Sequence, residues 1–425
     1  MTDRAASLTV RTDRCLVRSI HHSVRYVLVE IAAPPASADA VRPRVNVAFV
    51  LDRSGSMGGR NKITLAKEAL RHGIERLAAD DRFAVVVYDN QVDVVAYGRT
   101  ADAAAKRDAA RDLERIEARG STNLCDGWLR GAEQVALGMD PGAVNRVLLL
   151  TDGLANQGKT DPAELQRDAA ELRARGISTS TFGLGEDFDE RLLGAMADAG
   201  GGAFRFIGTA EEIPALIGSE VGELLEVTAK DVVLRIAGPE GLHLEPLAPY
   251  PFEQMPREGI LHVGDLVADQ VVRIVVKLGF PLGEPGRDAG VEFSIRDAAG
   301  RLDASATLTW SFADGDANDR QPRDREVDRV VARTYADRAL RDAVGLNRRG
   351  EWEQARALLR GVARRIRSYA GKDEILRGIV AELDREAEIW ATERLEYERK
   401  LMYSRSSYAL KSRMLDGAAE KRPRP

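Results

Sequence analysis

Hydrophobic positions in the first half of the chain switch between two spacings. Nearly continuous apolar runs at residues 45–51 and 146–150 predict strands that are buried on both faces. Between them, segments such as residues 63–78 carry apolar side chains at helical spacing. This alternation predicts a doubly wound, mostly parallel α/β sheet covered by helices on both faces, which we place at residues 44–226. Two short apolar segments around residues 89–90 predict a hairpin and one antiparallel edge strand.

Beyond residue 229 the hydrophobic spacing changes to alternation. Five short alternating segments, separated by Gly and Pro, predict antiparallel strands at residues 227–313. Five strands are few for a free-standing β-sandwich. Alternating segments within residues 1–43 could complete it, so we expect the α/β domain to be inserted in, or flanked by, an antiparallel β-sandwich.

Helical spacing returns after a polar linker at residues 313–325. The apolar positions there predict three antiparallel helices, and we place a C-terminal helical bundle at residues 320–402. Residues 403–425 form a basic tail without a clear pattern, which makes this segment a candidate for disorder.

The composition is that of a globular protein without a membrane span. Of the 425 residues 44% are hydrophobic, yet no apolar run approaches the length of a spanning helix. The N-terminus lacks a signal-peptide pattern, and two cysteines cannot build a disulfide framework, so we expect a cytoplasmic protein. The net charge of −5 hides a basic end: residues 320–425 carry 26 Lys or Arg and 18 Asp or Glu. Such asymmetry indicates different partners for the two parts, or attraction between them.

Three oxygen-bearing side chains follow the first strand of the predicted α/β domain. Asp52, Ser54 and Ser56 stand at alternate positions in a Gly-containing loop, at the strand end where open α/β sheets place ligands. Thr122 in a later loop and Asp152 at the end of a second buried strand add a hydroxyl and a carboxylate. Hard oxygen donors of this kind suit Mg²⁺. The alternative is that Ser54 and Ser56 only cap the following helix.

The order of these residues resembles the von Willebrand factor A (VWA) domain with its metal-ion-dependent adhesion site (MIDAS). The family pattern is DxSxS, then a Thr in a Gly-Ser-Thr-Asn loop, then a strand-end Thr-Asp-Gly, and the resemblance covers about residues 44–226. It implies that Ser54, Ser56 and Thr122 ligate Mg²⁺ directly, with Mn²⁺ or Ca²⁺ as alternatives. It implies that Asp52 and Asp152 act directly or through water.

The resemblance also implies a partner. In this family the metal typically takes a Glu or Asp side chain from another protein. Together with the Ala-, Arg- and Asp-rich composition, the resemblance indicates a bacterial intracellular protein with β and helical additions. Similar chains act beside ATPases or kinase and phosphatase signalling systems.

Other chemistries find less support in the sequence. Lys62 is followed by Ile63, which departs from the phosphate-binding GK[ST] loop, and the five histidines lack metal-ligand spacing. The basic tail carries no nucleic-acid-binding motif, so we expect no nucleic-acid partner. We therefore expect a non-enzymatic, metal-dependent protein-interaction module. The alternatives are a structural scaffold in which the metal only stabilises the fold, and a metal-assisted hydrolase.

Overall fold

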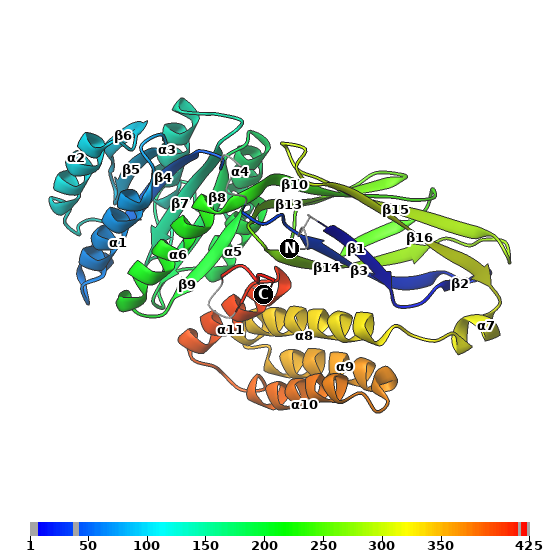
Figure 1. The fold of residues 1–425 in the computed structure, drawn as a ribbon. Coiled ribbons are helices and arrows are strands. Elements are labelled where there is room, and N and C mark those ends of the chain that lie inside the picture. The colour runs from blue at the N-terminus through cyan, green and yellow to red at the C-terminus, as the bar shows by residue number, and fades with distance from the viewer. Residues whose placement is uncertain (1–6, 37–41, 415–417, 423–425) are drawn as a thin grey trace. The chain divides into compact units, whose positions relative to one another are not determined.

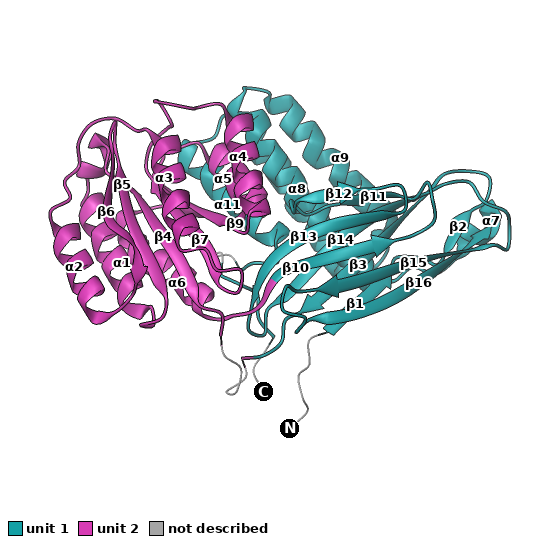
Figure 2. Ribbon diagram, turned by 90° about the horizontal axis from the view of Figure 1, so that it is seen from above, with its two compact units in different colours: residues 1–35, 231–425 teal, residues 36–230 magenta. Residues whose placement is uncertain are grey.

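The computed structural model describes residues 7–36, 42–414 and 418–422. Contacts divide the chain into two compact units (Figure 2). Unit 2 is Ala36–Lys230, and unit 1 is Met1–Pro35 together with Asp231–Pro425. Unit 2 is therefore inserted, in sequence, between the two parts of unit 1.

A six-stranded sheet with the order β6-β5-β4-β7-β8-β9 runs through unit 2 (Figure 1). Only β6 is antiparallel to its neighbour, and the other pairs are parallel. Every residue of β4 and β7 is buried, as their apolar runs predict for a sheet covered on both faces. The strands are β4 (Val45–Asp52), β5 (Arg82–Tyr88), β6 (Val92–Thr100), β7 (Val144–Thr151), β8 (Ser178–Leu184) and β9 (Gly201–Ile207).

Helices cover both faces of this sheet (Figure 1). A Cβ on Gly73 of α1 would lie 3.4 Å from the Phe49 ring, and one on Gly131 of α3 would lie 2.3 Å from Val50 Cγ2. Because successive residues of β4 point to opposite faces, α1 and α3 lie on opposite sides of the sheet. The helices are α1 (Lys62–Arg76), α2 (Ala103–Glu114), α3 (Leu124–Leu137), α4 (Pro162–Ala174), α5 (Glu190–Ala199) and α6 (Ile213–Leu225), with 3₁₀ turns η1 (Gly55–Gly58) and η2 (Ala210–Glu212).

Unit 1 contains two antiparallel sheets, with the orders β1-β3-β14-β11 and β12-β13-β10-β15-β16-β2. The only parallel pair in them, among the residues placed by the structure, joins β2 to β16. The strands are β1 (Ser7–Thr12), β2 (Leu16–Arg18), β3 (Ser23–Ala32), β10 (Val227–Ala237), β11 (His243–Pro246), β12 (Phe252–Gln254), β13 (Glu258–Val267), β14 (Val271–Phe280), β15 (Asp288–Arg296) and β16 (Asp303–Ala313).

The N-terminal strands take part in both sheets. β3 pairs with β14 along its whole length. The ring of the fully buried Trp310 in β16 contacts the ring of Phe280 in β14, and the two ring centroids are 5.1 Å apart. The predicted fold class, a doubly wound α/β domain inserted in or flanked by an antiparallel β-sandwich, is thus confirmed, and the order of the strands is that of an insertion. The predicted five strands after residue 227 are seven in the described chain, because β11 and β12 are too short to show alternation.

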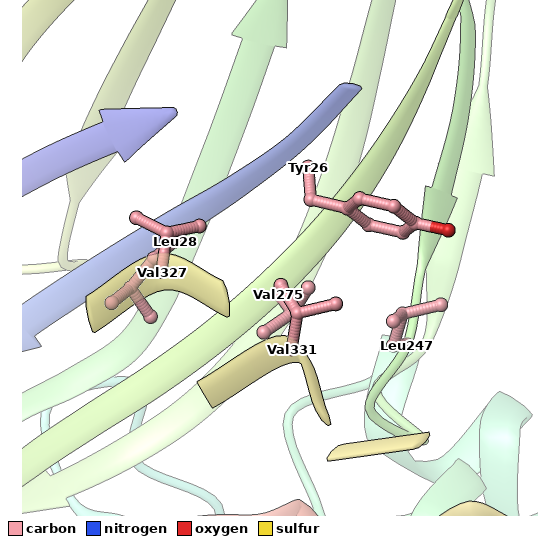
Figure 3. Packing of buried hydrophobic residues seen from close by; sticks show 6 residues of the cluster. All are labelled: Tyr26, Leu28, Leu247, Val275, Val327 and Val331. Atoms are coloured by element: carbon pink, nitrogen blue, oxygen red, sulfur yellow. The ribbon is translucent and has the colours of Figure 1, made fainter. Parts of the chain in front are cut away.

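The C-terminal helices pack on one of these sheets. Buried residues of α8 lie against β3, β14 and the segment after β11 (Figure 3), and the members of this cluster are Tyr26, Leu28, Leu247, Val275, Val327 and Val331. The helices are α7 (Gly315–Arg320), α8 (Arg325–Arg348), α9 (Trp352–Ala370), α10 (Glu374–Ile389) and α11 (Glu396–Leu410). None of the helices in the described ranges has the length and apolarity that a membrane crossing requires.

The end of the chain differs from the sequence prediction. In the described part of the chain end, four long helices follow α7 instead of three, and α11 continues into the segment predicted as a tail from residue 403. Its buried side includes the polar Lys400, Ser404 and Ser406, so hydrophobic spacing does not mark this helix. Further on, the Val271 N–H donates to Glu420 O at 2.8 Å, which ties residues 418–422 to β14. Residues 415–417 and 423–425 of the predicted tail lie outside the described residues.

Candidate metal site

The loop after β4 is built around Asp52, the last residue of that strand. Its carboxylate is fully buried, and Oδ1 accepts the Ser54 N–H at 2.8 Å. Oδ2 accepts the Thr151 hydroxyl at 2.7 Å, which links the ends of β4 and β7. Burial raises the pKa of Asp52 to about 6, and the hydrogen bonds from Thr151 and Ser54 oppose that rise. The carboxylate therefore sits where a nearby positive charge would favour its ionised form.

The two serines lie between the two predicted carboxylates. Ser54 Oγ and Ser56 Oγ are 3.0 Å apart, and Ser56 Oγ donates to Asp152 Oδ1 at 2.6 Å. Asp152 is fully buried at the end of β7, whereas Ser56 is exposed. Ser54 is also the residue before η1 but makes no side-chain cap hydrogen bond there. The alternative interpretation, that these serines only cap a helix, is therefore not supported at Ser54.

Thr122 completes the group from a second loop. A Cβ placed on Gly153 would lie 3.4 Å from Thr122 Oγ1 and 3.9 Å from Ser56 Oγ, so both hydroxyls adjoin this glycine. The Thr122 N–H donates to Asn156 Oδ1 at 3.1 Å, which fixes the loop from the side of β7. The structure thus brings all five predicted residues together at the carboxyl edge of the sheet.

The Thr122 loop depends on one glycine. Gly120 has φ +70°, and a Cβ on it would lie 2.2 Å from Asn90 Oδ1. Its carbonyl accepts the Gly55 N–H at 3.1 Å, so the two loops that carry the hydroxyls are joined directly. A larger residue at position 120 would meet both backbone strain and a clash.

The site also contains two residues that the sequence analysis did not predict. Thr151 bonds Asp52 as described above, and Lys62 Nζ lies 2.6 Å from Asp152 Oδ2. Lys62 comes from the first position of α1, where acidic residues are the usual choice. That unusual placement is the signal in the sequence that could have pointed to it.

The donor set narrows the kind of metal. Among the described residues, no group of three or more His, Cys, Asp or Glu could hold an ion. A metal at this site would therefore depend on hydroxyl oxygens together with the two carboxylates. Such donors fit a hard cation that keeps some of its water, such as Mg²⁺, and they do not suit a thiolate- or imidazole-bound zinc.

Comparison with protein families decides the identity of this part of the chain. The model of the von Willebrand factor type A domain matches residues 46–217. These residues form a VWA domain. The match includes all five residues of the site and ends within α6.

Relatives of the VWA domain occur in bacteria and animals. The uncharacterized protein YfbK of Escherichia coli is 31% identical over 209 residues, which are 49% of this chain and 36% of YfbK. Inter-alpha-trypsin inhibitor heavy chain H4 of Homo sapiens is 31% identical over 168 residues, or 38% of this chain and 18% of that protein. The chain therefore spans well under half the length of these relatives.

Two solved structures share the fold along almost the whole chain. A von Willebrand factor type A protein from Catenulispora acidiphila aligns with a TM-score of 0.69 and 20% identity, covering 93% of this chain and 98% of its own. The ArnB paralog VWA2 from Sulfolobus acidocaldarius aligns with a TM-score of 0.65 and 18% identity, covering 98% and 100%. The VWA domain with its antiparallel sheets and C-terminal helices is thus a fold that occurs in other proteins.

Proposed function

We propose that the VWA domain holds a divalent cation, Mg²⁺ first and Mn²⁺ or Ca²⁺ as alternatives, and uses it to capture an acidic side chain of a protein partner. The observation that carries this proposal is the convergence of three hydroxyls and two buried carboxylates at one edge of the sheet. Parallel α/β sheets bind their ligands at this edge.

The hydrogen bonds suggest which residues would contact the metal directly and which would act through water. Ser54, Ser56 and Thr122 would hold the cation through their hydroxyls. Asp52 already accepts two protein donors, so it is suited to orient a metal-bound water rather than to contact the metal directly. A cation held mainly by neutral hydroxyls keeps most of its charge and supplies a coordination position for a carboxylate.

The side chains around the hydroxyls give little support to catalysis. Cys125, close in sequence to Thr122, has its pKa raised to about 11 by burial, so its thiol is protonated near neutral pH. No histidine ring hydrogen-bonds to the five site residues in the described parts of the chain. A binding module is therefore favoured over a metal-assisted hydrolase, and a scaffold with a purely structural metal is the second candidate.

We propose that the partner is a protein that presents an acidic side chain. Our candidates are an ATPase or a kinase and phosphatase system in the cytoplasm. This part of the proposal rests on the family resemblance. Nucleic acid is not expected as the partner.

Affinity purification from the source cells tests the proposal. Wild-type bait loaded with Mg²⁺ should retain a partner that EDTA releases. Asp52→Ala should lose that capture with unchanged circular dichroism, because the metal loop loses its central acceptor. Asp80→Ala, which changes an exposed aspartate elsewhere in unit 2, is the matched control and should behave as wild type. Equal capture with Mg²⁺ and with EDTA would contradict the proposal, whereas Mg²⁺-dependent stability without capture would favour the scaffold.

A further inference from the structure

The site contains a lysine, Lys62, that is not among the residues of the VWA pattern. Lys62 Nζ pairs with Asp152 Oδ2 at 2.6 Å, and the two side chains are 16% and 0% exposed. Lys62 is the only cation that pairs with either site carboxylate among the residues whose placement is described, since Arg53 points to Asp89 and Asp93 instead. The pair is therefore a defined feature of the site and not one of many surface contacts.

The backbone delivers Lys62 to this position. Arg60 and Asn61 have φ values of 50° and 56°, a left-handed pair that turns the chain from the metal loop into α1. The Lys62 N–H then donates to Gly59 O at 3.1 Å. A cation at the start of a helix meets the positive end of its dipole, so helix stability does not account for a lysine here. Its pairing with Asp152 does.

The two site carboxylates consequently differ in charge balance. Among the described residues, the neutral Ser54 N–H and Thr151 hydroxyl are the donors to the Asp52 carboxylate, which keeps its charge available to a cation. Asp152 accepts the Ser56 hydroxyl and the ammonium of Lys62, so much of its charge is already compensated. A divalent ion in this site would meet two carboxylates and one ammonium, and the loaded site would remain positive.

We propose that Lys62 sets the selectivity of the VWA site for an anionic partner: it lowers the affinity for the metal and raises the affinity of the metal-loaded site for a carboxylate. The inference rests on the function proposed above and adds to it the residue that keeps Asp152 from neutralising the metal. A residue that only shaped the site would affect both affinities in the same direction. Lys62 should affect them in opposite directions.

The test uses the full chain with Mn²⁺ as the metal and acetate as the carboxylate. Mn²⁺ affinity is measured by electron paramagnetic resonance, and acetate affinity by its effect on water proton relaxation of the Mn²⁺-loaded protein. In Lys62→Met we expect Mn²⁺ to bind roughly tenfold more tightly and acetate to bind several-fold more weakly, as the loss of one partly screened charge at short range requires. Lys62→Arg keeps the charge and should resemble wild type.

The matched control is Lys67→Met, which removes a lysine of the same helix whose ammonium donates to the carbonyls of Glu114 and Ile116. It should leave both affinities unchanged. Unchanged or weaker Mn²⁺ binding in Lys62→Met, with wild type still binding Mn²⁺, would overturn the role of Lys62 alone. Absence of Mn²⁺ binding by wild type would overturn the proposed function and this inference with it.

Discussion

Asp52 and Asp152 are identical side chains, equally buried, with different surroundings. Neutral donors surround Asp52, while Asp152 faces a hydroxyl and an ammonium. The motif alone predicts both residues, because their order and spacing are local properties of the sequence. It does not predict Lys62, since the distance from Lys62 to Asp152 depends on the left-handed turn at Arg60 and Asn61.

A buried aspartate of the helical region gives a pH prediction. Burial raises the pKa of Asp337 from 3.8 to about 6, although Arg333 donates to its Oδ1 at 2.6 Å. Between those two values the folded state binds more protons than the unfolded state, so this contribution to stability is largest at low pH and falls as pH rises through about 6.

Asp337→Asn cannot titrate and removes that contribution. The thermal midpoint of the variant, relative to that of the wild type, should therefore rise when the pH is raised from about 4.5 to about 7. Thermal unfolding of both proteins at the two pH values measures this. A difference in midpoint that does not change with pH would contradict it.

At the scale of elements, the sequence predicts best where one environment covers the whole element. β4 and β7 are buried along their entire length, so their apolar runs identify them. The amphipathic α1 is likewise predicted to within two residues at each end. α11 escapes prediction because its inward face carries Lys400 and Ser404, whose environment is created only by distant parts of the chain.

The contact between α3 and β4 provides a second prediction. A Cβ on Gly131 would lie 2.3 Å from Val50 Cγ2, so Gly131→Ala forces the helix away from β4, the strand that ends at the proposed metal site. We expect a loss of about 1–3 kcal/mol in the free energy of unfolding, measured by urea denaturation. Gly378→Ala in α10 is the control, because nothing lies within 4 Å of its Cβ position. This variant should gain about 0.5–1 kcal/mol, and equal effects of the two changes would count against the close packing of α3.

At the scale of the whole molecule, the insertion of unit 2 explains why two separated segments of the sequence show the same hydrophobic pattern. The strand-forming residues 7–32 and 227–313 alternate in the same way because they share the two antiparallel sheets. The spacing of hydrophobic residues indicates that both segments form strands. It does not indicate which strands pair, since the paired strands β3 and β14 lie more than two hundred residues apart along the chain. Most of the Lys and Arg residues within residues 320–425 lie on helices α8 to α11 of unit 1.

The proposed metal site is tested most simply by counting the Mn²⁺ ions that the full chain binds, with electron paramagnetic resonance as the readout during a titration. We predict one tightly bound Mn²⁺ per wild-type chain and loss of this ion in the double variant Ser54→Ala, Thr122→Ala, which removes two of the three hydroxyls. Ser368→Ala, on the exposed surface of α9, should bind as wild type does. Equal binding by the wild type and the double variant, or no stoichiometric binding by the wild type, would contradict the proposed metal site.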